Sequence, residues 1–442
     1  MRAAVEWSTD LHCDVAVVGG GLAGVMAAVA AARTGADTIL VERSASLGGI
    51  AVDGPLEALM TFHDARGPVV GGLPMELVER LAGLGGSPGC VTDTTGYCRS
   101  IVPYDAECLR LALFQLVREA GVRLLLQTSV VYAVSADSSI AELALDGGSG
   151  LFGLRAGRYV DATGDAVLAH LAGAACRLSP EAQPMTTLIR VGGVDTAALR
   201  AYVSAHRGDF RLDGGGPEDD WLHLWGFGSL LQAGCDAGRL SLRRTEMHAM
   251  MTPRPGEWVL NYTRCAADPL TSAGRTQGQQ VTLEQAGELV AWLRDTLPPF
   301  AGSYLIQTGR IGIREGRQAV GQYELTAQDV LTAAPCPDPV ALGAFPIDIH
   351  QRQGDSLVCK AVPGAYPIPA RCLRSVDTKN LYLAGRGISA SHEALASVRI
   401  TATAMATGQA AGVMAALGEV GYAALRSALE RQGALLRRPD LT

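Results

Sequence analysis

The first third of the chain alternates short apolar runs with longer stretches that are alanine-rich or amphipathic. Residues 15–18 and 38–41 are apolar runs of strand length, and the alanine-rich residues 23–34 lie between them. A strand that is covered on both faces reads as a continuous apolar run, as in a parallel sheet. The pattern therefore predicts a buried strand, a helix that ends before Gly35, and a second, parallel strand.

The alternation of predicted strands and helices continues to about residue 184. Helical periodicity is predicted for residues 74–84 and 106–120, the second with Asp105 as its N-cap and Gly121 as its end. Strands are predicted at residues 122–128 and 130–134, in a hairpin of residues 140–145 with 151–155, and at residues 159–161.

The middle of the chain, residues 185–308, loses this alternation. It holds most of the tryptophans, several loop-like segments rich in Gly, Pro and Asp, and a predicted helix at residues 283–296. The last third returns to the earlier pattern, with a predicted strand at residues 380–384, a glycine turn, and a helix at residues 397–417.

The turn after the first strand carries the spacing G-x-G-x-x-G at Gly19, Gly21 and Gly24. Such glycines permit a tight turn, a close approach of a pyrophosphate and close packing of the helix on the strand. Glu42 stands at the tip of the second strand, 18 residues beyond Gly24, where a carboxylate accepts hydrogen bonds from ribose hydroxyls. A strand before the motif, a helix after it and an acid at this distance together predict a dinucleotide site.

These patterns predict an α/β fold with two parts. Residues 1–184 and 309–442 are expected to form a discontinuous Rossmann-like domain with a central parallel sheet in a three-layer arrangement. Residues 185–308 are expected to form an inserted α+β domain, which shapes or caps a substrate site.

Composition and charge narrow the class of protein. The hydrophobic fraction is 48% and the charged fraction 18%, which is typical of a globular chain. The net charge of −7 argues against non-specific binding to nucleic acid or to an anionic membrane. All basic residues except Lys360 and Lys379 are arginines, which points to a GC-rich bacterial genome. No run of 18 apolar residues predicts a membrane span, so we expect a cytoplasmic protein, with a homodimer left open.

The ten cysteines show no C-x-x-C spacing. This excludes a thioredoxin-like redox pair, a zinc ribbon and a ferredoxin-type cluster, and we expect no metal site. The cysteines are expected to be reduced thiols.

Several segments resemble the bacterial FAD-dependent oxidoreductase family, within the glutathione-reductase-like FAD-binding superfamily. The resemblance covers nearly the whole chain and implies FAD and a redox reaction, without implying a substrate. We expect FAD to be bound non-covalently, because no sequence feature favours a covalent link, and we expect a small-molecule substrate. The segments that carry it are the glycine motif with Glu42, Leu47-Gly-Gly49, Asp161-Ala-Thr-Gly-Asp165, Asn261-Tyr-Thr-Arg264, Gly312 to Thr326, Phe345 to His350, Tyr366-Pro-Ile-Pro369 and Gly385 to Ala394.

The resemblance also implies which residues contact FAD. The backbone at Val130 is expected to meet adenine, and a helix beginning near Ser397 is expected to point its positive end at the flavin pyrimidine. The other expected contacts are Gly19, Gly21, Leu22, Ala23, Gly24, Glu42, Arg43, Gly48, Gly49, Thr163, Gly164, Asp165, Gly385 and Arg386. The chain departs from the family pattern at Ile50, where a small polar residue is usual, and at Ala166, where glycine is frequent.

Four residues in the family-like motifs or near them are candidates for catalysis. His63, His350 and His392 are candidate proton acceptors, because a histidine exchanges a proton near neutral pH. Each is also compatible with a hydrogen-bonded structural role in the core or in a turn. Arg314 is a candidate for binding an anionic substrate, together with Arg317 if the segment is helical, although Glu315 offers both arginines a structural ion pair.

The predicted activity is that of a dehydrogenase or oxidase that takes a hydride from a small organic molecule through flavin N5, with a place in specialised metabolism. The alternatives are a flavin-dependent reductase of C=C bonds and a non-catalytic FAD-binding electron-transfer subunit. No second nucleotide motif predicts a dedicated NAD(P)H domain, which makes a monooxygenase less expected. The electron acceptor stays open between oxygen, a quinone and a protein carrier.

Overall fold

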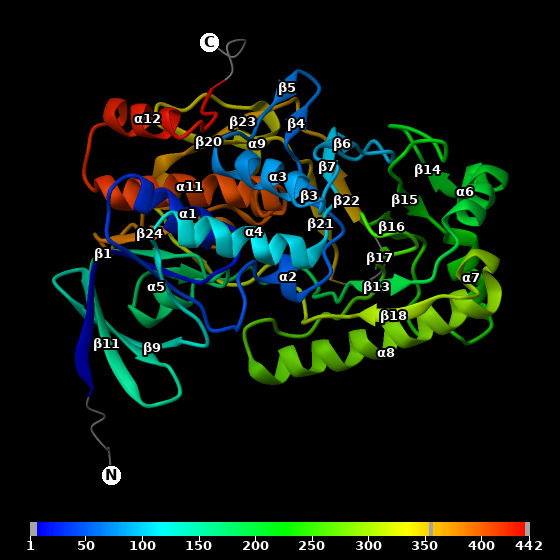
Figure 1. Cartoon of the computed structure of the whole chain (residues 1–442), viewed down its shortest axis with the longest axis horizontal. Helices are drawn as coiled ribbons and strands as arrows, with labels where there is room; N and C mark the ends of the chain where they lie inside the picture. The colour runs from blue at the N-terminus through cyan, green and yellow to red at the C-terminus, as the bar shows by residue number, and fades with distance from the viewer. Residues whose placement is uncertain (1–6, 353–356, 438–442) are drawn as a thin grey trace.

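The computed structural model describes residues 7–352 and 357–437 of the chain. Its largest sheet has seven strands and lies at one end of the molecule (Figure 1). Five strands are parallel, in the order β8 (Arg123–Leu125), β2 (Thr38–Val41), β1 (Ser8–Val18), β11 (Leu151–Asp161) and β24 (Leu381–Leu383). Strands β10 (Ser139–Asp146) and β9 (Ser129–Ala136) extend the sheet beside β11 in antiparallel order. The predicted α/β class with a central parallel sheet is confirmed.

Helices α1 (Leu22–Arg33) and α11 (Thr401–Leu417) pack side by side against the parallel strands (Figure 1). Two glycines of α11 allow this close approach. A Cβ atom at Gly408 would lie 2.2 Å from the carbonyl oxygen of Ala23, and one at Gly412 would lie 2.0 Å from that of Ala27. The start and the end of the chain therefore share one layer of the fold.

The first predicted elements are confirmed. Strand β2 has the predicted bounds, and α1 differs from the prediction by one residue at each end. Helix α4 (Ala106–Glu119) begins where predicted, since the Asp105 carboxylate accepts hydrogen bonds of 2.9 Å from the backbone N–H groups of Glu107 and Cys108. The predicted hairpin and the strand that follows it share one long strand, β11.

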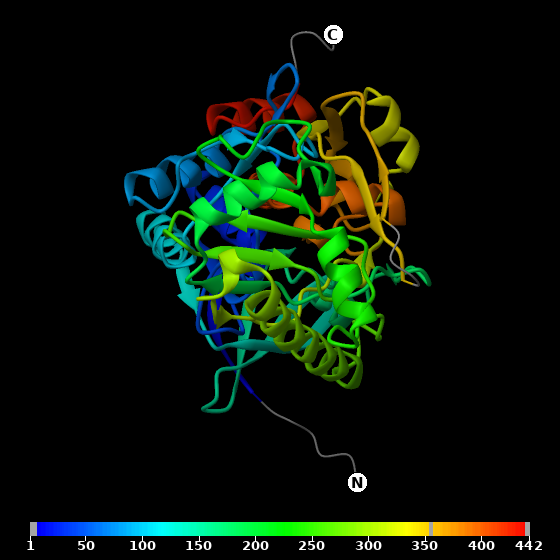
Figure 2. The same cartoon turned by 90° about the vertical axis from the view of Figure 1, so that its right-hand side faces the viewer.

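A second sheet of six antiparallel strands lies on the other side of the molecule, with the long helix α8 (Ser272–Thr296) across it (Figure 2). Its strands are, in spatial order, β14 (Phe210–Arg211), β15 (His223–Gly226), β16 (Met247–Met251), β17 (Trp258–Asn261), β13 (Ile189–Gly192) and β18 (Tyr304–Gln307). Helices α6 (Thr196–Ala205) and α7 (Gly228–Asp236) complete this part.

The two faces of the second sheet differ in polarity, because side chains alternate along each strand. Leu224, Ala249 and Leu260 face a hydrophobic core that also contains residues of α8. His248 and Asn261 alternate with these apolar residues and line the central cavity. A sheet with its own core supports our proposal that residues 185–308 form an inserted unit.

Two helix predictions are corrected. Helix α8 begins at Ser272, not near residue 283, with Thr271 as N-cap; its first turns contain Gly274 and Gly278, which obscured the helical pattern. The helix predicted at residues 397–417 is two helices, α10 (His392–Val398) and α11, at an angle of 94°. The Thr401 hydroxyl fixes the start of α11 through hydrogen bonds to the backbone of Met60.

The remaining elements are short and connect these layers. They are α2 (Ile50–Asp53), β3 (Leu59–Met60), β4 (His63–Asp64), β5 (Gly67–Pro68), α3 (Leu73–Gly83), β6 (Val91–Thr92), β7 (Ser100–Val102), α5 (Val167–Leu171), β12 (Cys176–Arg177), β19 (Gln318–Ala319), α9 (Ala327–Thr332), β20 (Pro339–Gly343), β21 (Ile347–His350), β22 (Leu357–Lys360), β23 (Tyr366–Pro369) and α12 (Tyr422–Arg431).

All ten cysteines are free thiols. Within residues 7–352 and 357–437, no single helix has both the length and the apolar character needed to cross a membrane. Helices α10 and α11 pass that test only when they are joined across their 94° bend, and most of α11 is buried in the protein core.

Candidate active site

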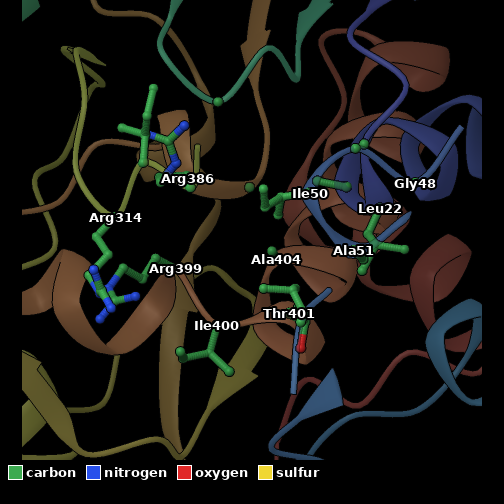
Figure 3. A pocket seen from close by; sticks show the side chains of 18 of the residues that line it. Leu22, Gly48, Ile50, Ala51, Arg314, Arg386, Arg399, Ile400, Thr401 and Ala404 are labelled. Carbon is green, nitrogen blue, oxygen red and sulfur yellow. The ribbon is translucent and has the colours of Figure 1, made fainter. Parts of the chain in front are cut away.

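A cavity of about 670 Å³ runs between the two sheets. One end is lined by Gly19, Gly21 and Glu42 from the first strand–helix–strand unit. The other end is lined by polar residues of the second sheet and of the chain's last third. Figure 3 shows Leu22, Gly48 and Ala51 on one side of the cavity, with Arg314 and Arg399 on the opposite side.

The glycines of the G-x-G-x-x-G motif have two different surroundings at the first end of the cavity: Gly19 and Gly24 are closely packed, whereas Gly21 faces open space. A Cβ atom at Gly24 would lie 1.8 Å from the carbonyl oxygen of Gly19, so α1 reaches the strand only if residue 24 is glycine. Gly19 has a φ of +102°, which favours glycine. At Gly21, by contrast, a Cβ atom would meet nothing within 4 Å, although the residue lines the cavity. The open space at the start of α1 fits a phosphate group.

Glu42 is fixed at the end of β2 with its side chain almost fully buried. Its Oε2 atom accepts a hydrogen bond of 2.5 Å from the Gly20 N–H, and its Oε1 atom accepts one of 2.7 Å from the Ser44 N–H. Each carboxylate oxygen keeps a second lone pair. The carboxylate can therefore accept further hydrogen bonds, and its contact with a ribose stays a prediction.

A carboxylate held between two arginines lies farther along the cavity. Asp165 Oδ1 lies 2.7 Å from Nη1 of Arg386, and its Oδ2 lies 3.0 Å from Nη2 of Arg275. The turn before it is held by Asp161, whose carboxylate accepts hydrogen bonds from Thr163 and Ala169. Because Asp165 compensates part of the charge of both arginines, these groups form a fixed polar wall rather than a free cationic site.

A buried chain of an aspartate and two histidines borders the polar end of the cavity. Asp93 Oδ1 lies 2.8 Å from Nδ1 of His223, and Nε2 of His223 lies 3.0 Å from Nδ1 of His248. His223 lies on β15 and His248 on β16, where Met250 is the direct partner of His223. The two histidines are therefore diagonal neighbours on the same face of the sheet.

The charges along this chain are set by burial and by hydrogen bonds. Burial disfavours the charged carboxylate of Asp93, but His223 and the N–H of Cys98 outweigh it and hold the pKa of Asp93 well below its usual range. Burial also opposes the positive charge of His223, yet Asp93 raises the pKa of His223 overall. Burial and the neighbouring His223 lower the pKa of His248 well below its usual value. A proton that enters at His248 is therefore more stable on His223.

Glu57 lies beside these histidines. Its Oε2 atom accepts a hydrogen bond of 3.3 Å from Asn261, whereas its buried Oε1 atom has no hydrogen-bond partner among the described residues. Burial raises the pKa of Glu57. Ligand atoms of Glu57, His223 and His248 lie within 4.8 Å of one another, close enough to share a metal ion. The direct hydrogen bond between the histidines explains their proximity without a metal.

A second group of charges contributes to the same end of the cavity. Asp348 Oδ2 lies 3.2 Å from Nη2 of Arg399 and 3.3 Å from Nε2 of His350. The other nitrogen of His350, Nδ1, accepts a hydrogen bond of 2.8 Å from Arg264. The buried Arg314 donates from Nη1 to the carbonyl oxygen of Pro184 at 2.8 Å.

A search against protein families matches residues 14–426 to the family described as FAD dependent oxidoreductase. The chain belongs to this family. It is therefore an FAD-dependent oxidoreductase, and the predicted family and cofactor are confirmed. No curated protein sequence matches it.

Solved structures that are similar to this one include those of three other proteins. They are a geranylgeranyl bacteriochlorophyll reductase-like protein from Thermoplasma acidophilum (14% identity, 96% of this chain, 82% of that chain, TM-score 0.45), the flavin-dependent brominase Bmp2 (12%, 95%, 83%, 0.48) and p-nitrophenol 4-monooxygenase from Pseudomonas putida (11%, 96%, 82%, 0.47). Similarity at this level gives no information on substrate or reaction.

In this FAD-dependent oxidoreductase, the predicted cofactor residues lie together with two exceptions. Gly24 packs against Gly19 and does not line the cavity. Ser397 is fully buried and donates its hydroxyl to the carbonyl oxygen of Phe345. The helix start that does border the cavity is at Ile400 and Thr401, because the predicted helix is broken there. The predicted cofactor residues that do line the cavity are Gly19, Gly21, Leu22, Ala23, Glu42, Arg43, Gly48, Gly49, Val130, Thr163, Gly164, Asp165, Gly385 and Arg386.

The two departures from the family pattern have distinct surroundings. Ile50 lines the cavity at the first position of α2. Ala166 has a φ of +47°, in the left-handed region where glycine is favoured. The conformation therefore explains why glycine is frequent at this position, while alanine adopts it here at some cost in backbone energy.

The predicted catalytic residues separate into two groups. His350 and Arg314 line the cavity, whereas His63 and His392 do not. His63 lies on β4 with Nδ1 3.0 Å from the Ser100 hydroxyl, and His392 lies 2.9 Å from the buried carboxylate of Glu315. Both of these outer histidines therefore have the hydrogen-bonded structural environment that was left open as their alternative role.

The predicted pairing of Arg314 with Arg317 is corrected. The segment is not helical, and Arg317 does not line the cavity. The residue beside Arg314 is Arg399, which comes from the junction of α10 and α11 (Figure 3).

Sequence reasoning missed several other residues that line the cavity. His223 and His248 belong to the middle segment, which has no motif with a known chemical role, and Arg399 is separated from Arg314 by 85 positions of sequence. A histidine on each of two strands was the available signal, but the pairing of β15 with β16 was needed to bring them together. The other missed residues are Glu57, Tyr97, Asn261, Arg275, Arg310 and Asp348.

Proposed function

We propose that this FAD-dependent oxidoreductase is a dehydrogenase or oxidase that removes a hydride from a small organic substrate, while the Asp93–His223–His248 chain takes the accompanying proton. One observation carries the proposal. The buried aspartate and histidine pair ends on the same cavity that the predicted FAD contacts line. FAD, when bound there, supplies a hydride acceptor at flavin N5.

The hydrogen-bond geometry supports a proton path in two steps. When His223 is neutral and donates from Nδ1 to Asp93, its Nε2 atom accepts from Nδ1–H of His248. The Nε2 atom of His248 then has a free lone pair and can take a proton from a substrate O–H or N–H group. As it does so, the Nδ1 proton of His248 passes to His223, and Asp93 stabilises the imidazolium that forms.

The surroundings of the cavity favour this reaction. Ile50, Ala51 and Ile400 provide apolar walls, which exclude water and strengthen the polar interactions inside. The N-terminal end of α11 adds a partial positive charge at Thr401, which stabilises negative charge in the cavity.

Anaerobic mixing of the FAD-loaded enzyme with a panel of 2-hydroxy acids, 2-amino acids, alcohols and amines tests the proposal. We expect one class to bleach the visible flavin band. His248→Gln should slow that reduction by about 100-fold or more, with FAD content unchanged. His206→Gln is the matched control, because His206 is exposed and stacks on Tyr202 away from the cavity.

Three results would contradict the proposal in different ways. A normal rate of flavin reduction in His248→Gln would show that Asp93, His223 and His248, the proton chain, take no part in the mechanism. If no donor bleaches the flavin but an enoate such as crotonate reoxidises the reduced enzyme, the protein is a C=C reductase. Turnover only with a co-purified redox partner would indicate an electron-transfer subunit. Hydrogen peroxide formed in air would distinguish an oxidase from a dehydrogenase that uses a quinone or a carrier.

A further inference from the structure

The cavity contains a buried arginine, Arg314, that forms no ion pair with any described residue. Arg314 is 7% exposed, and no carboxylate in residues 7–352 and 357–437 lies within ion-pair distance of it. Its hydrogen bond to Pro184 uses one guanidinium nitrogen. A buried charge normally has a partner of opposite sign, because loss of hydration costs several kcal/mol for an isolated ion. A bound anion would supply the ion-pair partner that Arg314 lacks.

Charges of both signs surround Arg314. Burial and the neighbouring Arg399 lower the pKa of Arg314 to about 9, and Arg244 acts in the same direction. Asp348, a nearby carboxylate that stays ionised, compensates part of the charge of Arg314. It lies beyond ion-pair distance of Arg314, however, and its Oδ2 atom is shared by Arg399 and His350. A charged Glu57 would also raise the pKa of Arg314, but burial raises the pKa of Glu57 and so favours its neutral form.

Arg399 reaches the same place with unused hydrogen-bonding capacity. Its side chain is 12% exposed, and its buried Nε atom has no hydrogen-bond partner among the described residues. Figure 3 shows Arg314 and Arg399 reaching into the same side of the cavity. Two adjacent guanidinium groups match the two oxygens of a carboxylate, to which arginine donates paired hydrogen bonds.

We propose that Arg314 and Arg399 form a subsite for the carboxylate of the substrate, which is therefore a small organic acid. This inference rests on the proposed function for the step that oxidises the acid, but not for its binding. The histidines of the proton chain, His223 and His248, line the same cavity as the two arginines. The class that fits both groups is an acid with an oxidisable C–H bond beside a hydroxyl or amino group, such as a 2-hydroxy or 2-amino acid.

The balance of the reaction is that of a two-electron oxidation. The C–H bond of the substrate breaks with its electron pair, and the hydride passes to the oxidised flavin. The O–H or N–H bond loses its proton to His248, and a C=O or C=N bond forms. The carboxylate keeps its charge throughout and remains bound to the two arginines.

Binding without turnover tests the subsite. Propionate is titrated into the FAD-loaded enzyme, and the perturbation of the flavin absorption spectrum reports occupancy. Propionamide, which has the same shape without the charge, serves as the neutral comparison. We expect propionate to bind, propionamide to bind at least 10-fold more weakly, and Arg399→Gln to weaken propionate binding by about 10- to 100-fold.

Arg314→Gln should act in the same direction, and Arg314→Lys should restore part of the affinity because it restores the charge. Arg317→Gln is the matched control, since Arg317 lies three positions along the chain and outside the cavity lining. FAD content and thermal unfolding of each variant separate loss of the subsite from loss of the fold.

Equal binding of propionate and propionamide, or unchanged propionate affinity in both glutamine variants, would overturn the inference. Loss of FAD from both variants, with unchanged propionate affinity once they are reloaded with FAD, would overturn it too, because the arginines would then serve the cofactor. Tight binding of inorganic phosphate with no binding of propionate would assign the site to a different anion. If propionate binds as expected but no acid reduces the flavin, the subsite stands and the proposed oxidation fails.

Discussion

The guanidinium group of Arg386 lies 2.7 Å from the carboxylate of Asp165, and Gly316 leaves the space that this contact needs. A Cβ atom at residue 316 would lie 2.0 Å from Oδ1 of Asp165 and 2.9 Å from Nη1 of Arg386. The ion pair forms part of the cavity wall that the predicted FAD contacts line.

We therefore expect Gly316→Ala to displace the pair and weaken FAD binding by about 10-fold or more. Quenching of flavin fluorescence on titration of the apoprotein measures this affinity. Gly287→Ala is the control, because a Cβ atom there meets nothing within 4 Å on the exposed side of α8. Unchanged FAD affinity in Gly316→Ala would show that this wall does not hold the cofactor.

The proton chain predicts a dependence of flavin reduction on pH. Asp93 raises the pKa of His223 overall, with Glu57 acting in the same direction and burial opposing both. Proton uptake requires neutral His223, so the rate should rise with pH through an inflection above the ordinary histidine value of about 6.5. In Asp93→Asn the negative charge is lost, so the inflection should move to lower pH, and the maximal rate should fall by about 100-fold or more.

Stopped-flow reduction between pH 5 and pH 9 measures both quantities, and the range follows from the ordinary titration of histidine at about 6.5. A profile that is identical in the wild type and Asp93→Asn would exclude His223 as the group that receives the proton. A lower rate with an unmoved inflection would give Asp93 a role in orienting His223 only.

Removal of metals distinguishes the proton chain from a metal centre at the same place. Glu57, His223 and His248 are close enough to share an ion, but the 3.0 Å contact between the two histidines is satisfied as a hydrogen bond. We expect dialysis against EDTA to leave flavin reduction unchanged and elemental analysis to find well below one divalent metal per chain. One equivalent of metal whose removal abolishes activity would replace the proton chain with a His–His–Glu metal site.

The contact between α1 and α11 predicts a large effect on stability. Gly412→Ala would place a Cβ atom 2.0 Å from the carbonyl oxygen of Ala27, where the backbone of α1 cannot yield easily. We expect the free energy of unfolding to fall by about 2–3 kcal/mol. Urea unfolding measures the change, and Gly287→Ala should instead raise the stability by about 0.5–1 kcal/mol as a gain in helix propensity. Equal midpoints for Gly412→Ala and the wild type would show that the two helices separate without cost.

The first strand–helix–strand unit was predictable because local chemistry determines it. Gly19 and Gly24 have backbone conformations and distances that exclude a side chain, and Asp105 caps α4 through its own carboxylate. Features of this kind depend on residues that are close in sequence, so a pattern in one segment is sufficient to infer them.

The substrate end of the cavity was not predictable in this way. His223 meets His248 only because β15 pairs with β16 in one register, and Asp93 joins them from a loop before β7. The pairing of Arg314 with Arg317 followed from an assumed helix, whereas Arg399 is brought there by the bend between α10 and α11. Such contacts arise from tertiary packing, which leaves no periodic trace in either segment.

The glycines of α11 also have a consequence for biosynthesis. Residues 22–33 emerge from the ribosome long before residues 401–417, yet each helix forms one side of the same contact. Until residues 401–417 have been synthesised, α1 lacks its partner and the cavity lacks the wall that Ile400, Thr401 and Ala404 provide. A nascent chain that ends before residue 401 therefore has the glycine turn after β1 but not the complete cavity, which forms only when residues 401–417 pack against α1.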